Sequence, residues 1–427
     1  QTNMKVGVVG CGTAGAAAAL FLKRLGHDVE VFERVPEPMP VGAGVLLQPT
    51  GMTVLSKLGL LDDVWQRAAR IERLWGRTPW GRCVLNVRYG DYNRFTKHSF
   101  EPVHGLGIHR GVLFQTLFDA VKAAHISVHC GVEITDCENS DNQVKLIDSA
   151  GEPHGEFDLI VAADGTRSAM RQTDLCSALV RRSKDYLWGA LWAIVPGVLS
   201  DYSQTLFQVY AGTKRLLGFL PTGSAIRADE PLTSIFWSIR LDRVDAWRKR
   251  KIDDWKAEMC SLAPNAEPLL DFIQDHDQMA VAGYLDMEMK KWNTDRIVFL
   301  GDAGHSMSPQ LGQGANFALM DAMVLSEVLQ SPEFQSQRSI PSALDEYTKR
   351  RKAQLRYYQF ASRFLTPLFQ CSFTPLSWPR DWIFEPVSRI PFFKRQMVES
   401  LVGAKTGHFT ALAESRVVGY QTKAPQP

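Results

Sequence analysis

The first thirty-three residues show the hydrophobic pattern of a strand, a helix and a second strand. Residues 5–9 are a short apolar run, residues 13–25 carry Ala and Leu at helical spacing, and residues 28–32 are apolar again. Gly26 follows the helical segment at the position where glycine commonly ends a helix. A strand, a tight turn, a helix and a second strand build half of a dinucleotide-binding unit, so we expect an α/β domain to begin here.

The same mixture of buried strands and amphipathic helices returns later in the chain. The predicted elements are an extended segment over residues 42–49, helices over 51–58, 110–124 and 315–330, and strands over 126–130, 143–148, 157–162 and 296–300. Apolar, β-branched strands such as the last two are typical of a parallel sheet that is covered on both faces. These segments predict a discontinuous α/β domain over residues 4–70, 101–180 and 286–335.

Between these segments the pattern changes to short strands and turns. Residues 71–100 are rich in Trp, Tyr and Arg, and residues 187–195, 205–219 and 232–241 are aromatic and β-branched runs. Such runs, separated by turn residues, are typical of an antiparallel sheet. We therefore predict a second, mostly antiparallel β-sheet domain over residues 71–100 and 181–285, followed by a helical C-terminal region over residues 336–427.

Composition narrows the class of protein. The chain of 427 residues is 45% hydrophobic and 22% charged with a formal net charge of +2, which predicts a globular, enzyme-sized protein and argues against a nucleic-acid binder. The seven cysteines are scattered and never spaced as Cys-x-x-Cys, so neither a disulfide framework nor a metal site is predicted. The first strand begins at Lys5 and no apolar run approaches the ~20 residues that span a bilayer, so we expect a cytoplasmic protein without a transmembrane segment.

The turn after the first strand has the spacing of a dinucleotide-binding loop. Gly10, Gly12 and Gly15 match G-x-G-x-x-G, with Ala14 inside the motif, and the motif stands between the first strand and the first helix. In that setting the first glycine makes the turn, the second admits a pyrophosphate and the third lets the helix pack on the strand. Glu33 ends the second strand, where an acid holds the adenosine ribose. The motif predicts an ADP moiety, which NAD and FAD share.

A second glycine-rich loop follows the strand at residues 296–300. Asp302 stands at the end of this strand, and Gly312, Gly314, Ala315 and Asn316 lead into the next helix. An acid and a second helix N-terminus suit a cofactor with a diphosphate, a polyol and a ring that becomes anionic on reduction. This charge pattern favours FAD over NAD. An Asp at a strand end also serves as an ordinary helix cap, and that alternative stays open.

These loops, with a third motif, carry a family resemblance. Residues 162–171 contain Asp164-Gly165 and are similar to a flavoprotein Asp-Gly motif. Over residues 4–360 the sequence resembles the class A, para-hydroxybenzoate hydroxylase-like family of FAD-dependent aromatic hydroxylases. The resemblance implies a Rossmann-like FAD-binding domain, a substrate domain built on the antiparallel sheet, FAD as cofactor and NAD(P)H as co-substrate.

The resemblance also implies roles for single residues. It places Arg34 and Val132 near the adenine end, Arg110 near the FAD phosphates or ribityl chain, Gly44 and Val45 beside the isoalloxazine, Asp164 at FAD and NAD(P)H, and Pro309 against the flavin. No Tyr or Arg of the second domain matches a substrate-binding residue of a known hydroxylase, so no catalytic acid or base is assigned. His305 is open to a structural or a catalytic role.

The implied reaction is the hydroxylation of a small, aromatic or unsaturated organic substrate by O2 through a flavin C4a-hydroperoxide, with consumption of NAD(P)H. An FAD-dependent oxidase, epoxidase or halogenase on the same scaffold stays open as an alternative. A further alternative is a protein that holds flavin and a small ligand without turnover.

The C-terminal region has its own signature. Residues 364–394 are unusually aromatic and are interrupted by prolines. Such a segment packs against its own domain, covers the active site, forms the contact of a homodimer or rests peripherally on a membrane. The sequence leaves these alternatives, and the choice between a monomer and a homodimer, open.

Overall fold

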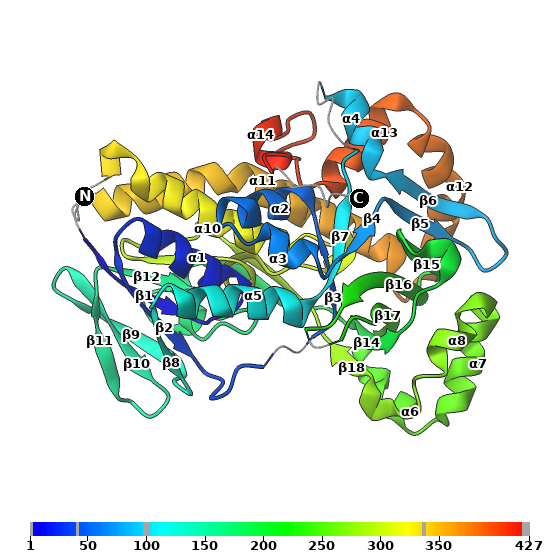
Figure 1. Cartoon of the computed structure of the whole chain (residues 1–427), viewed down its shortest axis with the longest axis horizontal. Helices are drawn as coiled ribbons and strands as arrows, with labels where there is room; N and C mark the ends of the chain where they lie inside the picture. The colour runs from blue at the N-terminus through cyan, green and yellow to red at the C-terminus, as the bar shows by residue number, and fades with distance from the viewer. Residues whose placement is uncertain (1–2, 40–41, 97–101, 227, 335–338, 421–427) are drawn as a thin grey trace.

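A computed structural model describes residues 3–39, 42–96, 102–226, 228–334 and 339–420 (Figure 1). A parallel sheet covered by helices forms one lobe, on the left of Figure 1, and a larger sheet with its own helices forms the other lobe, at the lower right. The predicted fold class, an α/β FAD-binding architecture with a second sheet and a helical C-terminal region, is confirmed.

The parallel sheet begins with β1 (Lys5–Val9), β2 (Asp28–Glu33) and β8 (Ser127–Cys130) and ends with β12 (Leu159–Ala162) and β20 (Ile297–Phe299). Its order is β20-β12-β1-β2-β8, and every neighbouring pair is parallel. This is the Rossmann order, in which ligands bind at the carboxyl ends of the central strands. Because β12 and β20 are buried along their whole length, they need the continuous apolar runs that the sequence shows.

Helices and a small sheet cover the parallel sheet. The helices α1 (Thr13–Arg24), α5 (Arg110–Ala123) and α10 (Gly314–Gln330) pack beside one another, with α1 between the other two. The antiparallel sheet of β9 (Ile134–Ser140), β10 (Gln143–Asp148) and β11 (Pro153–Phe157) contacts β1 and β12. The strand and helix predictions for this lobe are confirmed to within a few residues.

The second lobe is built on a seven-stranded sheet of order β18-β14-β17-β16-β15-β5-β6. Its strands are β5 (Arg73–Arg77), β6 (Cys83–Arg88), β14 (Trp188–Pro196), β15 (Thr205–Ala211), β16 (Arg215–Ser224), β17 (Pro231–Arg240) and β18 (Ala280–Ala282). All neighbouring pairs are antiparallel except β15 and β5, which run parallel. The run predicted over residues 205–219 forms two antiparallel strands, because Gly212 at φ +66° lies in the turn of a hairpin between β15 and β16.

One face of this sheet is covered by short helices. Ile235, Trp237 and Ile239 of β17 point to the same side and join one apolar cluster with Trp247 and Trp255. The covering helices are α6 (Val244–Arg248), α7 (Ile252–Leu262) and α8 (Glu267–Leu270). The period-two alternation of β17 therefore sends its odd-numbered residues to this cluster and its even-numbered residues to the opposite face.

Two small sheets connect the lobes. The first has the order β3-β7-β4, with β3 (Gly44–Leu47), β4 (Ala69–Ile71) and β7 (Gly105–His109), and the second pairs β13 (Val180–Asp185) with β19 (Leu285–Met289). A Cβ atom on Gly107 would lie 1.9 Å from the carbonyl oxygen of Pro221, so β7 approaches β16 closely only because it has a glycine there. The short helices α2 (Pro49–Lys57), α3 (Leu61–Trp65) and α4 (Tyr92–Phe95) follow β3 and β6.

The C-terminal region is helical, as predicted. It consists of α11 (Ile340–Phe369), α12 (Ser377–Ser388), α13 (Pro391–Leu401) and α14 (Glu414–Val417). The long α11 packs along α10 of the first lobe, whereas α12 and α13 pack against β6 of the second. The region therefore joins the two lobes. No helix among the described residues combines the length and apolar composition needed to cross a bilayer.

Candidate functional site

The glycine loop between β1 and α1 leaves its outer side open. A Cβ atom on Gly10, at φ +95°, would lie 2.5 Å from the carbonyl oxygen of Ala163, and one on Gly15 would lie 1.9 Å from that of Gly10. Both glycines therefore permit close packing. Gly12 is exposed at the N-cap of α1, and no described residue places an atom within 4 Å of its Cβ position. The free backbone N–H groups of the first turn of α1 can donate hydrogen bonds to a phosphate there.

The carboxylate of Glu33 is tied to this loop. It accepts hydrogen bonds from the backbone N–H of Cys11 at 2.8 Å and of Val35 at 2.9 Å. The backbone N–H of Val132 donates to the Glu33 carbonyl at 3.1 Å, and Arg34 is exposed beside them. The structure thus gathers the three residues predicted at the adenosine end next to the glycine loop. Burial, together with the nearby Glu33 carboxylate, raises the pKa of Cys11 to about 12, so this thiol stays protonated.

The Gly-Asp loop lies against the same helix. Gly301, at φ +60°, places its Cβ position 3.1 Å from the Ala14 side chain on α1 and 3.3 Å from the Ala318 side chain on α10. The exposed Asp302 begins the short helix α9 (Asp302–His305), and its Oδ1 is 4.0 Å from the Cβ position of Gly314. The N-termini of α1 and α10 and the carboxylate of Asp302 therefore border one surface. This surface fits an extended dinucleotide with an anionic centre and hydroxyl groups.

The Asp-Gly motif is joined to the Gly-Asp loop by Arg171. This buried guanidinium donates to the carbonyl oxygens of Ala303 and Thr166, both at 2.6 Å. The Thr166 hydroxyl donates to Asp302 Oδ2 at 3.1 Å. The motif spacing gives Arg171 no role, and its contact with the distant Gly-Asp loop reveals one.

Asp164 lies inside this arrangement. One of its oxygens accepts the backbone N–H of Met170 at 3.1 Å, and the other is buried without a partner among the described residues. Burial raises the pKa of the Asp164 carboxyl, although Ser168, Met170 and Arg171 act in the opposite direction. Its unpaired oxygen can accept a hydrogen bond from a bound ligand.

The residues predicted at the flavin ring lie where the two lobes meet. The backbone N–H of Gly44 donates to Ser234 Oγ of β17 at 3.2 Å, and Val45 is half-buried beside it. The exposed Arg110 starts α5, and its backbone N–H donates to the Ala43 carbonyl at 3.0 Å. The exposed Pro309 opens a short turn that ends at Gly312, at φ +59°. Ala315 is half-buried in the first turn of α10.

Asn316 is fully buried and holds backbone groups together. Its Oδ1 accepts the Gln48 backbone N–H at 2.8 Å, and its Nδ2 donates to the carbonyls of Leu46 and Gly312, both at 3.1 Å. These contacts fix β3 against the start of α10. The neighbouring Gln48 side chain is also buried; its Oε1 accepts the Tyr89 hydroxyl at 2.7 Å, whereas its Nε2 has no partner among the described residues. Nothing in the sequence spacing pointed to Gln48.

His305 belongs to a buried polar cluster behind the Gly-Asp loop. Its Nε2 is 2.6 Å from Asp321 Oδ2, which also accepts the Gly301 backbone N–H at 2.8 Å. Arg351 Nε donates to the other Asp321 oxygen at 2.6 Å. All three side chains are buried, so the histidine supports the loop from behind. The partners Asp321 and Arg351 lie on α10 and α11, at separations in sequence that carry no local signal.

Comparison with known proteins agrees with this geometry. The family described as the FAD binding domain matches residues 3–358. The FAD-dependent urate hydroxylase of Klebsiella pneumoniae is 28% identical over 364 residues, which cover 83% of this chain and 87% of that protein. The kynurenine 3-monooxygenase of Salinispora arenicola is 27% identical over 348 residues, which cover 76% of this chain and 72% of that protein.

Solved structures show the same fold. The structure of Klebsiella pneumoniae HpxO complexed with FAD and uric acid superposes with a TM-score of 0.75 at 22% sequence identity, covering 93% of this chain and 97% of that chain. The predictions of the family, of FAD as cofactor and of an FAD-dependent monooxygenase are confirmed, with NAD(P)H as the co-substrate typical of the family. The chain belongs to the FAD binding domain family of FAD-dependent aromatic hydroxylases.

Proposed function

We propose that this enzyme hydroxylates a small, uncharged aromatic or unsaturated compound that binds between the Pro309 turn and the even-numbered face of the seven-stranded sheet. In this proposal, residues 4–70, 101–180 and 286–335 bind FAD, and residues 71–100 and 181–285 bind the substrate. When bound, FAD would supply the hydride acceptor for NAD(P)H and the site of O2 chemistry. The protein's own residues hold the cofactor, orient the substrate and exclude water.

The cofactor contacts follow from the open surfaces of the site. The first turn of α1, with Gly10, Gly12 and Gly15, would bind the pyrophosphate. The Glu33 carboxylate would accept hydrogen bonds from the ribose hydroxyls, which would compete with the backbone N–H groups that now donate to it. Asp302 would accept hydroxyl protons of the ribityl chain. The remaining proposed contacts are Ala14, Arg34, Gly44, Val45, Arg110, Val132, Asp164, Pro309, Gly312, Gly314, Ala315 and Asn316.

The observation that carries the substrate class is the apolar cluster next to Gly312. The Cβ position of Gly312 is 3.9 Å from Leu46 Cδ2 and 3.9 Å from Gln48 Nε2. Leu46 belongs to one apolar cluster with Leu220 and the partly buried Phe236. Apolar walls with few polar groups favour an uncharged, ring-shaped substrate. The unpaired Gln48 amide would donate one hydrogen bond, to the substrate or to the flavin.

The test has a cofactor arm and a substrate arm. Asp302→Ala should lose FAD, because the only carboxylate at the start of α9 is removed, and Asp295→Ala is the matched control, since Asp295 is an exposed acid before β20. FAD content is read from the flavin absorption spectrum. A wild-type protein that stays colourless after reconstitution with FAD would sink the proposal.

The substrate arm follows NADH and NADPH oxidation over phenols, quinolones, indoles and polyketide-like aromatics, each with a carboxylated analogue. Uncharged compounds should stimulate oxidation and gain an oxygen atom. Stimulation by the carboxylated analogues alone would contradict the apolar site, and oxidation without oxygen incorporation would favour an oxidase.

The location of the protein and its assembly belong to the same proposal. We expect a cytoplasmic protein that is a monomer or a homodimer.

A further inference from the structure

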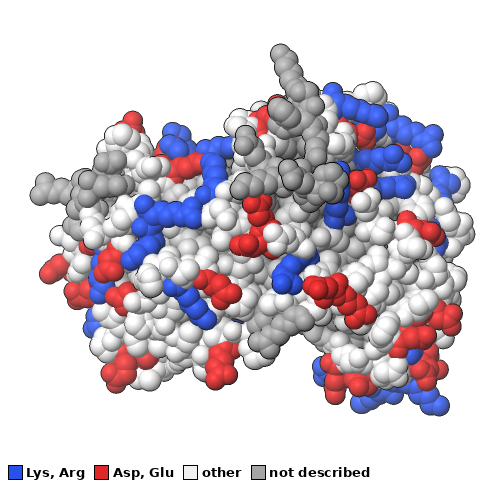
Figure 2. Space-filling model, viewed as in Figure 1, with Lys and Arg blue, Asp and Glu red and all other residues white. Residues whose placement is uncertain are grey.

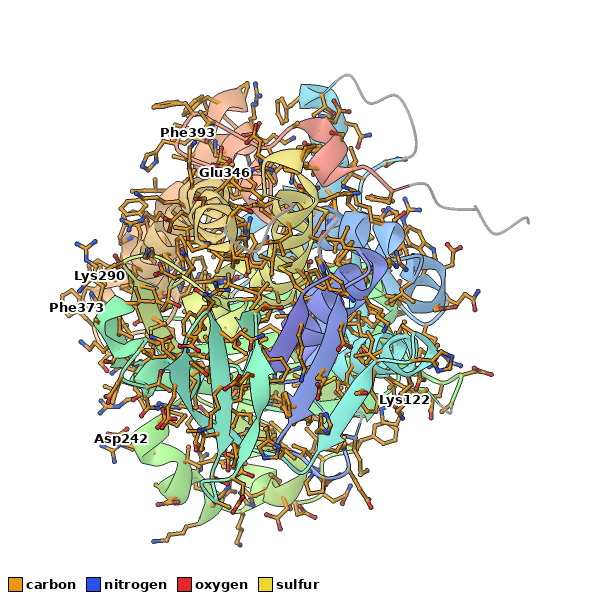
Figure 3. All side chains as sticks on the ribbon, turned by 90° about the vertical axis from the view of Figure 1, so that its left-hand side faces the viewer. Lys122, Asp242, Lys290, Glu346, Phe373 and Phe393 are labelled. Carbon is orange, nitrogen blue, oxygen red and sulfur yellow. The ribbon has the colours of Figure 1, made fainter. Side chains whose placement is uncertain are left out.

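The C-terminal region exposes large apolar side chains on one side of the molecule. Phe373, Trp378, Trp382, Ile383, Phe392 and Phe393 have exposed fractions between 44% and 69%. We call these six residues the C-terminal aromatic face. They lie in or next to α12 and α13, and the labelled Phe373 and Phe393 both project from the left-hand side of Figure 3. Large apolar side chains that are exposed together on helices in mutual contact are typical of an interaction site.

Basic side chains border this face. Residues 370–412 contain five Lys or Arg and three Asp or Glu. Of the bases, Arg389 and Arg395 are exposed and Lys394 is half-buried, whereas Arg380 and Lys405 are buried. The three acids are neutralised locally, because Asp381 pairs with Arg380 at 2.6 Å, Glu385 with Arg389 at 2.6 Å and Glu399 with Arg395 at 2.7 Å. Figure 2 shows acids and bases mixed over the face that it draws.

The aromatic and basic groups are also interleaved. The guanidinium of Arg82 lies 3.6 Å from the centroid of the Trp382 ring, and the Arg389 side chain is 77% exposed. Trp and Phe next to Arg and Lys match the chemistry of a bilayer interface, where rings enter the acyl boundary and cations meet anionic headgroups. A second copy of the same face would bring like charges together, which opposes self-association.

The helices have the dimensions of an interfacial element. The helix α12 has 12 residues and α13 has 11, and Pro386 and Pro391 interrupt the segment. At 1.5 Å per residue each helix is about 18 Å long, shorter than the ~30 Å hydrocarbon core. These helices can therefore lie on a bilayer and cannot cross it.

We propose that the C-terminal aromatic face docks the enzyme on a lipid bilayer that contains anionic headgroups. The docked region contacts the flavin loop directly, since Gln313 Nε2 donates to the carbonyls of Ser400 at 3.2 Å and Leu401 at 2.8 Å, at the end of α13. Docking would hold this end of the site near the membrane surface, where uncharged aromatic compounds accumulate. The proposal that this face binds a bilayer does not depend on the chemical class of the substrate.

Vesicle flotation tests the proposal with the full-length, FAD-loaded enzyme. The wild type should float with phosphatidylcholine vesicles that contain phosphatidylglycerol, and less with phosphatidylcholine alone or at high salt. Trp378→Ser combined with Phe393→Ser should weaken binding by about tenfold or more, because two inserted rings are lost. Phe272→Ser is the matched control, since Phe272 is 48% exposed just after α8, outside the C-terminal aromatic face, and it should float like the wild type.

Flavin spectra and NAD(P)H oxidation with a water-soluble substrate check that the double variant is folded. A wild type that does not float with either vesicle would overturn the proposal, as would a double variant that floats unchanged. Equal binding to both vesicles would overturn the anionic component. A wild-type dimer by light scattering that the double variant converts to a monomer would identify a second copy of the chain as the occupant and overturn membrane docking.

Discussion

At the scale of single residues, the clearest determinant of the site's shape is a carboxylate that no ligand is expected to touch. Asp321 is fully buried and connects His305 and Arg351 to the backbone N–H of Gly301. Burial alone would raise the pKa of the Asp321 carboxyl. The facing charges of His305 and Arg351 and the Gly301 hydrogen bond outweigh burial and hold this pKa below its ordinary value.

This lowered pKa makes an acid-dependent prediction. Because the folded pKa lies below the unfolded value of about 3.9, the contribution of Asp321 to stability is present above that value and is lost as the pH falls through the folded pKa. Asp321→Asn should lower the unfolding free energy near neutral pH by about 3 kcal/mol or more, since Arg351 is left buried beside a neutral group.

Thermal unfolding measured between neutral pH and pH 3 checks this prediction. Asp321→Asn should show a shallower loss of melting temperature than the wild type below about pH 4. The matched control is Asp295→Asn, an exposed acid that should retain the wild-type slope. Parallel pH profiles for the wild type and Asp321→Asn would show that the cluster does not carry the acid sensitivity.

At the scale of elements, the glycine loop at the start of α1 separates packing from ligand binding. The Cβ of Gly15→Ala would meet the Gly10 carbonyl oxygen at 1.9 Å, whereas that of Gly12→Ala would meet no described atom within 4 Å. We expect Gly15→Ala to destabilise the apoprotein by about 1–3 kcal/mol, and Gly12→Ala to change it by less than about 1 kcal/mol.

For FAD affinity we expect the opposite order, in which Gly12→Ala causes a large loss. The Gly12→Ala methyl group lies on the open side of the loop, where the pyrophosphate would approach, so FAD affinity should fall by about tenfold or more. Urea unfolding of the apoprotein and fluorescence titration with FAD provide the two measurements. Unchanged FAD affinity in a stable Gly12→Ala protein would move the pyrophosphate away from α1.

The elements also show which parts of the fold a sequence can predict. The unit β1-α1-β2 was predicted because its strand, turn and helix signals lie within thirty-three neighbouring residues. The hairpin at Gly212 was missed because the apolar run continues on both sides of it. The parallel pairing of β15 with β5 joins segments about 130 residues apart, and no local pattern encodes such a partner.

At the scale of the whole molecule, the candidate site is assembled by contacts that the motifs do not contain. The motifs predicted which loops form the site, and the structure places Glu33 at the glycine loop and Asp302 beside Gly314. The supports behind them were not predictable: Arg171 joins two loops, and Gln313 ties the flavin loop to the end of α13. The role of each of these polar side chains can be recognised only from a partner that is far away in the sequence.

Gly403 lies where the C-terminal region meets the flavin-binding lobe. Its carbonyl accepts Gln354 Nε2 of α11 at 2.7 Å, and its Cβ position lies 2.5 Å from Thr50 Oγ1 and 3.1 Å from Gln313 Oε1. At φ +82° an alanine is strained by about 1 kcal/mol, and its methyl group would also push Thr50 and Gln313 away.

Gly26→Ala is the control for this variant, because Gly26 has φ +86° and no described atom lies within 4 Å of its Cβ position. Both variants should lose about 1 kcal/mol of stability from backbone strain. Only Gly403→Ala should lose further stability and bind FAD more weakly, because Gln313 is the residue that precedes α10, next to the flavin loop. Equal FAD affinity for the two variants would mean that the C-terminal region leaves the cofactor site unaffected, and that it joins the lobes without shaping the flavin loop.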